Sequence, residues 1–172
     1  MTDPETYLLD ANVFIEAKRR YYAFDICPGF WDSLVLHHSS GRIGSIDRVQ
    51  KVELEKGKDD LTVWAASEVP DAFFAATDEE DVLRWYAEIV AWVQSQAQFF
   101  PEAKTEFAGS VDGWLIAYAK AKTLTLVTHE VLALEARKNV PIPNVCEAFD
   151  IRYADTFDML RALETRFILQ RA

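Results

Sequence analysis

The sequence predicts an α/β fold built on a small parallel sheet. Short, mostly apolar runs at 7–9 and 124–127 are typical of strands that are buried on both faces. Longer segments lie between these runs, and their apolar residues recur every three to four positions, as in helices. The chain has 172 residues, 50% of them hydrophobic, which suits one sizeable core. We therefore expect a single three-layer domain over residues 1–172, with four or five parallel strands flanked by helices.

The first strand, at 7–10, is expected at the centre of the sheet because it is short, apolar and first in the chain. We expect a second strand at the turn region 41–44 and another at 124–128. A long helix is predicted over 78–100 and should stop before Pro101. The other predicted helices span 12–20, 29–39, 46–56, 59–67, 112–122 and 155–167, and 130–138 is either a short helix or irregular.

The net charge of −10 argues against general nucleic-acid binding, which needs cations that neutralise phosphates. It does not exclude a nuclease that contacts phosphate through a metal ion and local basic patches, such as 18–20 or the cations between 48 and 58. The two cysteines lack metal-binding spacing. No apolar run approaches the roughly 20 residues of a membrane span, and the N-terminus lacks the basic region of a signal peptide. We expect a cytosolic protein with no membrane partner.

Four acidic residues stand at the ends of separate apolar runs, namely Asp10, Glu53, Asp112 and Glu130. Acids that follow strands or open helices in α/β proteins tend to meet at the carboxyl edge of the sheet. Several carboxylates in one cleft repel each other and are costly to desolvate. Mg²⁺ or Mn²⁺ removes that cost, because these ions prefer oxygen ligands. The pattern predicts a divalent-metal site for phosphoryl transfer or hydrolysis.

Each acid also has a structural interpretation. Asp10 and Asp112 stand where helix N-caps occur, and Glu130 could be a favourable charge in a first helical turn. Glu53 could be solvated one step off the apolar stripe. If Glu53 faces the core instead, it needs a cation, which either a metal ion or Arg48 could supply.

Four further residues are candidates for substrate binding near the same edge. Asn12 could hold a phosphate by hydrogen bond, or could serve local turn chemistry. The Thr128 hydroxyl could orient water or phosphate, and Arg48 could contact the substrate. His129 lacks an evident Ser or Cys partner, so a supporting role or plain packing fits it better than a general base.

Several common catalytic motifs are absent from the sequence. It contains no G-x-x-x-x-G-K-[ST], G-x-G-x-x-G, G-x-S-x-G or H-E-x-x-H pattern. P-loop nucleotide hydrolases, dinucleotide-dependent enzymes, serine hydrolases and zinc proteases of the H-E-x-x-H type are therefore disfavoured.

The sequence resembles the PIN-domain family of metal-dependent ribonucleases. YLLDANVFI, at 7–15, looks like the family's opening strand with its first acid. RVQKVELEKG, at 48–57, looks like the helix with the second acid. SVDGWLIAYAKAKTLTLVTHE, at 110–130, looks like the segment with the third acid, the last strand and the site edge.

The resemblance implies a single-strand-selective ribonuclease that uses Mg²⁺ or Mn²⁺. It assigns the family's first three acids to Asp10, Glu53 and Asp112, and a common Ser/Thr position to Thr128. Glu130 departs from the pattern, because PIN-domain toxins usually carry Asp at that position. The longer Glu side chain changes the geometry of the fourth acid.

The segments at 21–34 and 142–161 resemble a branch of unknown function that has been placed among prokaryotic toxin–antitoxin toxins. This resemblance implies an RNA substrate and a cognate antitoxin. Related toxins often dimerise, and Trp85, Tyr86 and Trp92 could serve either a homodimer interface or the core. Two other functions stay open: a PIN-like interaction module without activity, and an aspartyl-phosphate phosphatase, which usually needs Asp where this chain has Asn12.

Overall fold

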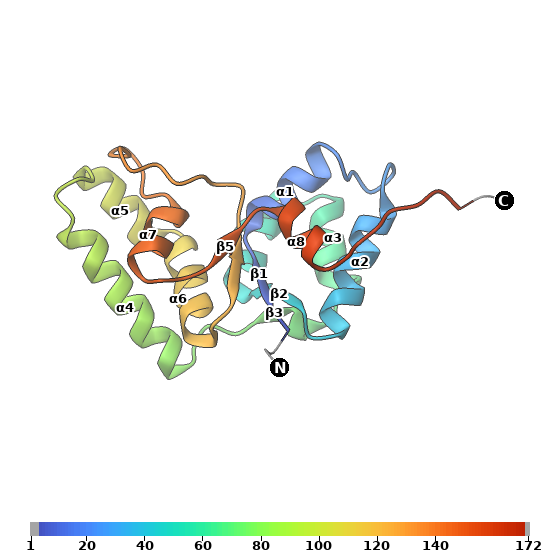
Figure 1. Ribbon diagram of the computed structural model, residues 1–172, viewed down its shortest axis with the longest axis horizontal. Coiled ribbons are helices and arrows are strands. Elements are labelled where there is room, and N and C mark those ends of the chain that lie inside the picture. Colours follow the sequence, from blue (N-terminus) through green and yellow to red (C-terminus); the bar gives the residue numbers. More distant parts are fainter. Residues whose placement is uncertain (1–3, 171–172) are drawn as a thin grey trace.

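The computed structural model describes residues 4–170 and contains one five-stranded parallel sheet (Figure 1). The strand order is β3-β2-β1-β4-β5, so β1 lies at the centre, as predicted. The chain forms β1, β2 and β3 outward in one direction and then adds β4 and β5 on the other side of β1. The strands are β1 (Tyr7–Leu9), β2 (Ile43–Ile46), β3 (Phe74–Ala75), β4 (Thr125–Val127) and β5 (Tyr153–Ala154).

Helices cover both faces of the sheet, which confirms the predicted α/β class. In Figure 1, α4, α5, α6 and α7 form one layer and α1, α2, α3 and α8 form the other. The α-helices are α1 (Ala11–Arg19), α2 (Pro28–Ser39), α3 (Asp60–Ser67), α4 (Glu80–Ser95), α5 (Pro101–Gly109), α6 (Asp112–Lys122), α7 (Ile142–Ala148) and α8 (Thr156–Ala162). The π-helix η1 (Val49–Leu54) and the 3-10 helices η2 (Glu55–Gly57) and η3 (Asp71–Phe73) complete the helical elements.

The core lies along the short central strand and between it and the two helical layers. All three residues of β1 are buried, which explains why its sequence is apolar throughout rather than alternating. Phe14 of α1 fills the space beside β2 and β3, where its ring lies 5.8 Å from Trp64 and 6.1 Å from Phe73. This packing fixes α1, and therefore the residues at its N-terminus, against the sheet.

The predicted long helix over 78–100 is wrong at its C-terminal end. Helix α4 ends at Ser95, and a second helix, α5, begins at Pro101. Pro101 does not only stop a helix: it occupies the first turn of α5, where a missing N–H costs nothing. Between the two helices, the Gln98 side chain donates hydrogen bonds of 2.7 Å to the carbonyls of Leu134 and Ala136.

Two other predicted helices differ in the structure. The segment over 46–56 is a π-helix followed by a 3-10 turn, so Val49 and Leu54, five residues apart, are both buried. The last helix ends at Ala162 rather than at residue 167, because Glu164 adopts a left-handed φ of 54°. Residues 130–138 are irregular, one of the two alternatives for that segment.

The aromatic residues of α4 pack within the chain. The Tyr86 ring stacks on Trp114 at 3.7 Å, and Trp85 and Trp92 meet Phe149 edge to face. These contacts account for the aromatic content of α4, so it gives no argument for a dimer interface. Within residues 4–170, no helix combines the length and the apolar character needed to cross a membrane.

Candidate active site at the carboxyl edge of the sheet

The chain order in the sheet reverses between β1 and β4, and ligands of open α/β sheets bind outside the carboxyl ends of the strands at such a point. Asp10 follows β1 directly and Thr128 follows β4 directly. The backbone N–H of Asp10 donates to the Val127 carbonyl at 3.0 Å, which extends the pairing of the two strands to this edge. The topology therefore brings two of the predicted site residues together at the expected place.

Asp10 is a buried carboxylate, with only 5% of the residue exposed. The Thr128 hydroxyl donates to its Oδ2 at 3.0 Å and accepts from the backbone N–H of Glu130 at 3.2 Å. Asp10 stands at the N-cap position of α1, but its side chain makes no capping hydrogen bond. Burial raises the pKa of Asp10 to about 6, and the charge of Glu130 adds to the rise. The Thr128 hydroxyl and the nearby backbone N–H groups of Ala11 and Asn12 act in the opposite direction.

Asp112 lies in the first turn of α6, where its backbone N–H donates to the Ser110 hydroxyl at 3.3 Å. Burial raises the pKa of Asp112 to about 7, and the negative charge of Asp10 adds to the shift. The charges of Glu130, Glu53 and Glu106 act in the same direction. All four predicted acids therefore influence one site electrostatically.

Glu106 is an acid that the sequence analysis missed. It lies on α5, a helix that was not predicted, and α5 packs against α6 beside Asp112. A Pro followed by a polar first turn is a common helix start, and this signal at Pro101 could have revealed α5.

The described part of the chain offers no cation partner for Asp10 and Asp112, the inner two acids of the site. Within residues 4–170, no ion pair involves Asp10, Asp112 or Glu130. Two cations of the predicted basic patch at 18–20 are engaged elsewhere: Lys18 pairs with Asp59 and Asp60, and Arg20 pairs with Glu16. Carboxylates buried without a cation are costly when ionised, which is the physical meaning of their raised pKa values.

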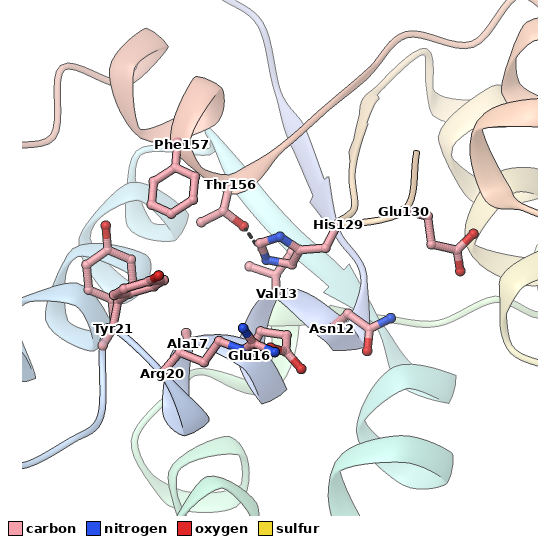
Figure 2. A pocket seen from close by; sticks show the side chains of 11 residues that line it. Asn12, Val13, Glu16, Ala17, Arg20, Tyr21, His129, Glu130, Thr156 and Phe157 are labelled. Atoms are coloured by element: carbon pink, nitrogen blue, oxygen red, sulfur yellow. Dashed lines mark hydrogen bonds and ion pairs between the residues drawn. The ribbon is translucent and has the colours of Figure 1, made fainter. Parts of the chain in front are cut away.

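Glu130 and Glu53, the outer two acids, have contacts that the sequence did not predict. Glu130 accepts a 2.7 Å hydrogen bond from the backbone N–H of Ile142, at the start of α7, and Figure 2 shows its carboxylate directed away from His129. Burial raises the pKa of Glu130. Glu53 is about one third exposed and lies 4.0 Å from Lys56. It does not face the core as an α-helical register predicts, because η1 is a π-helix.

Arg48 does not neutralise Glu53. Its Nε donates to the Thr77 hydroxyl at 2.9 Å, and its guanidinium lies 3.8 Å from the centre of the Trp114 ring. Thr77 in turn donates to Asp47 at 2.9 Å. These contacts fix Arg48 at the carboxyl ends of β2 and β3, on the face of α6 that carries Trp114.

Asn12 and His129 line a pocket of about 410 Å³ that also includes Glu130 (Figure 2). The His129 ring is exposed, and its Nε2 is hydrogen-bonded to the Thr156 hydroxyl at 3.1 Å. This bond ties the segment after β4 to the start of α8. The candidate substrate residues Asn12 and His129 therefore lie beside the acids, on the side facing α8.

The donor chemistry of the inner acids fits a hard divalent cation. Buried Asp10 and half-buried Asp112 offer carboxylate oxygens that have no counterion within residues 4–170, and Mg²⁺ and Mn²⁺ favour such ligands. However, no group of three or more His, Cys, Asp or Glu side chains within residues 4–170 lies close enough together to hold a metal ion. The fit is therefore one of charge and donor type, with Asp10 and Asp112 as the principal candidates.

Fold and site together define an α/β protein with a buried acid, Asp10, and half-buried acids around it at the switch point of a parallel sheet. The chain belongs to the family described as a domain of unknown function, DUF4411, whose model matches residues 7–167. The match covers the whole sheet and every helix. No curated protein and no solved structure gives a significant match to the chain.

Proposed function

We propose that this protein is a metal-dependent endoribonuclease that hydrolyses RNA phosphodiesters with Mg²⁺ or Mn²⁺. The observation that carries the proposal is the pair of acids at the switch point of the sheet, buried Asp10 and half-buried Asp112, neither of which forms an ion pair within residues 4–170. Strongly perturbed carboxylates in such a place are candidates for function rather than for stability. The resemblance to PIN-domain ribonucleases supports the same reaction.

Asp10 and Asp112 are the residues that would hold the ion, and Glu130 and Glu53 lie within electrostatic reach of Asp112. A bound Mg²⁺ or Mn²⁺ supplies a bound water of lowered pKa and stabilises negative charge on the reacting phosphate. Thr128 orients the Asp10 carboxylate through its 3.0 Å hydrogen bond. The Asn12 amide would hold a phosphate oxygen at the mouth of the site, and the His129 ring, which lines the same pocket, would contact the substrate beside it.

The proposed biological role is that of the toxin in a prokaryotic toxin–antitoxin pair, which rests on the resemblance to that branch. The net charge of −10 supports a cognate antitoxin with basic groups facing the acidic edge. The same charge repels RNA, so cleavage should depend strongly on divalent ions and on ionic strength.

The proposal is tested by incubating the purified protein with a panel of single-stranded and structured RNAs in Mg²⁺, Mn²⁺ or EDTA. We expect endonucleolytic products with either metal, none with EDTA, and no hydrolysis of p-nitrophenyl phosphate. Intact RNA under every metal condition would contradict the proposal. Hydrolysis of the phosphate ester alone would favour the phosphatase alternative.

A second candidate function is a PIN-like interaction module without activity. It is favoured by the lack of a three-residue ligand group within residues 4–170. The engagement of Glu130 with α7 points the same way. Mn²⁺ distinguishes the two functions: an assembled site is stabilised by the ion, whereas the module is not.

A further inference from the structure

The pocket of about 410 Å³ beside the acids has two chemically different ends. It lies between α1, α8 and the segment that follows β4 (Figure 2). In that view Phe157 and Tyr21 lie at one end, Asn12 and Glu130 at the other, and His129 between them. The polar end adjoins the acidic edge of the sheet, and the aromatic end points away from it.

The aromatic end of the pocket carries two rings that are only partly buried. Tyr21 is 70% exposed and Phe157 is 40% exposed. Among the described residues, Tyr21 packs against no other aromatic ring, and Phe157 meets only Tyr22, at 6.5 Å. Tyr22 stacks on Phe30 at 4.5 Å, so it supports Phe157 from a fixed position. The exposed face of Phe157, held beside the packed ring of Tyr22, is suited to stacking with a planar ligand.

The middle of the pocket holds several donors and acceptors. His129 is fixed by its hydrogen bond to Thr156, and Arg20 and Glu16 form an ion pair of 2.6 Å along α1. Groups of this kind match the edges of nucleobases, which carry mixed donors and acceptors. The Arg20–Glu16 pair also makes this wall close to neutral, unlike the acids beside it.

We propose that this pocket binds one unstacked nucleobase of a single-stranded RNA, next to the phosphate that is cut. The proposal rests on the nuclease function argued above and adds a binding site for one base beside the reacting phosphate. The volume falls within the range of about 300–1,000 Å³ that is usual for small-molecule sites. A base stacked and paired in a duplex cannot enter such a pocket, whereas a base in a loop can turn out onto an aromatic ring.

The Asp10→Asn variant allows binding to be measured without cleavage. A fluorescein-labelled ten-nucleotide single-stranded RNA is titrated with this variant in Mg²⁺ and followed by fluorescence anisotropy. Adding Phe157→Ala or Tyr21→Ala should each weaken binding about tenfold, because a stacked base contributes about 1–3 kcal/mol. A duplex of the same sequence should bind more weakly and should not respond to these changes.

Two further variants keep the test decisive. Phe157→Leu retains apolar volume without an aromatic face, so a tenfold loss there cannot be ascribed to unfolding. Phe100→Ala is the matched control, because Phe100 is 38% exposed but precedes α5, in the other helical layer. Equal affinity for Phe157→Leu and its parent would overturn the base-binding proposal. If the parent binds no RNA, an unchanged KM for cleavage by Phe157→Leu in the wild-type background overturns it instead.

The base-binding proposal and the nuclease proposal can be refuted separately. If Phe157→Leu weakens binding while the wild type leaves all RNAs intact, the pocket stands and the nuclease is wrong. If the wild type cleaves RNA and Phe157→Leu cleaves it with an unchanged KM, the nuclease stands and the pocket is wrong.

Discussion

RNA cleavage by the Asp10→Asn and Asp112→Asn variants is expected to fall by about 1,000-fold or more, which corresponds to roughly 4 kcal/mol of lost transition-state stabilisation. Asn has nearly the shape of Asp but lacks its charge and is a poor ligand for Mg²⁺. In Asp10→Asn, the amide oxygen can still accept the hydrogen bond from Thr128. The change therefore removes charge from the site while leaving its packing in place.

Initial rates of cleavage of one labelled RNA, measured with saturating Mn²⁺, test this expectation. Circular dichroism and the melting temperature establish that each variant is folded. Asp32→Asn is the matched control, because Asp32 is exposed on α2 and should leave the rate unchanged. A rate within threefold of wild type for either Asp10→Asn or Asp112→Asn would show that the acid is not part of the reaction.

The metal-free protein is expected to lose stability as the pH rises from about 4 to about 7. Asp10 and Asp112 have folded-state pKa values of about 6 and about 7, above their ordinary value of 3.8. In this range the folded state still binds protons on Asp10 and Asp112, whereas the unfolded state has released them. Protonation of the two acids therefore stabilises the fold fully below about pH 4, and this contribution is lost above about pH 7. For Asp10 alone the loss is about 3 kcal/mol.

Melting temperatures in EDTA at pH 5 and pH 8 measure this effect, which should be on the order of 10 °C. Burial lowers the pKa of His37, which gives an opposite slope in the same range, so the comparison with Asp10→Asn and Asp112→Asn isolates the carboxylates. Both variants should show a smaller loss, and Mn²⁺ should restore wild type at pH 8. Equal pH dependence in wild type and variants would refute the assignment.

The sheet and its inner acids could be predicted because their signals are local. Asp10 follows an apolar run of three residues, and Thr128 follows another, so both had to lie at the carboxyl edge of a parallel sheet. The central position of β1 followed from the same apolar run. Asp112 opens a helix that leads into β4, which places its N-terminus at that edge as well.

The surroundings of Glu53 and Arg48 could not be predicted, because they depend on contacts between distant segments and on an unusual helix. In a π-helix, residues on the same face are about five positions apart rather than three or four. The apolar periodicity of this segment does not reveal that change in spacing. Arg48 meets Thr77 and Trp114, which lie 29 and 66 residues further along the chain. Nothing in the sequence of η1 itself indicates those partners.

The pocket could not be predicted either, since its walls come from three separated parts of the chain. Tyr21 and Phe157 are 136 residues apart, and neither stands in a motif with a known chemical role. Phe157 was part of a helix predicted over 155–167, where an aromatic residue normally indicates core packing. Phe157 is exposed because α8 lies across the end of α1, and the sequence does not reveal this arrangement.

The central claim, that Asp10 and Asp112 hold a divalent cation, is tested most directly by titrating Mn²⁺ into the metal-free protein at pH 8. Electron paramagnetic resonance reports the free ion. We predict saturable binding of one or two Mn²⁺ per chain, which is lost in both Asn variants and retained in Asp32→Asn. Mn²⁺ that stays free, or that binds the Asn variants as well as it binds wild type, would contradict the account.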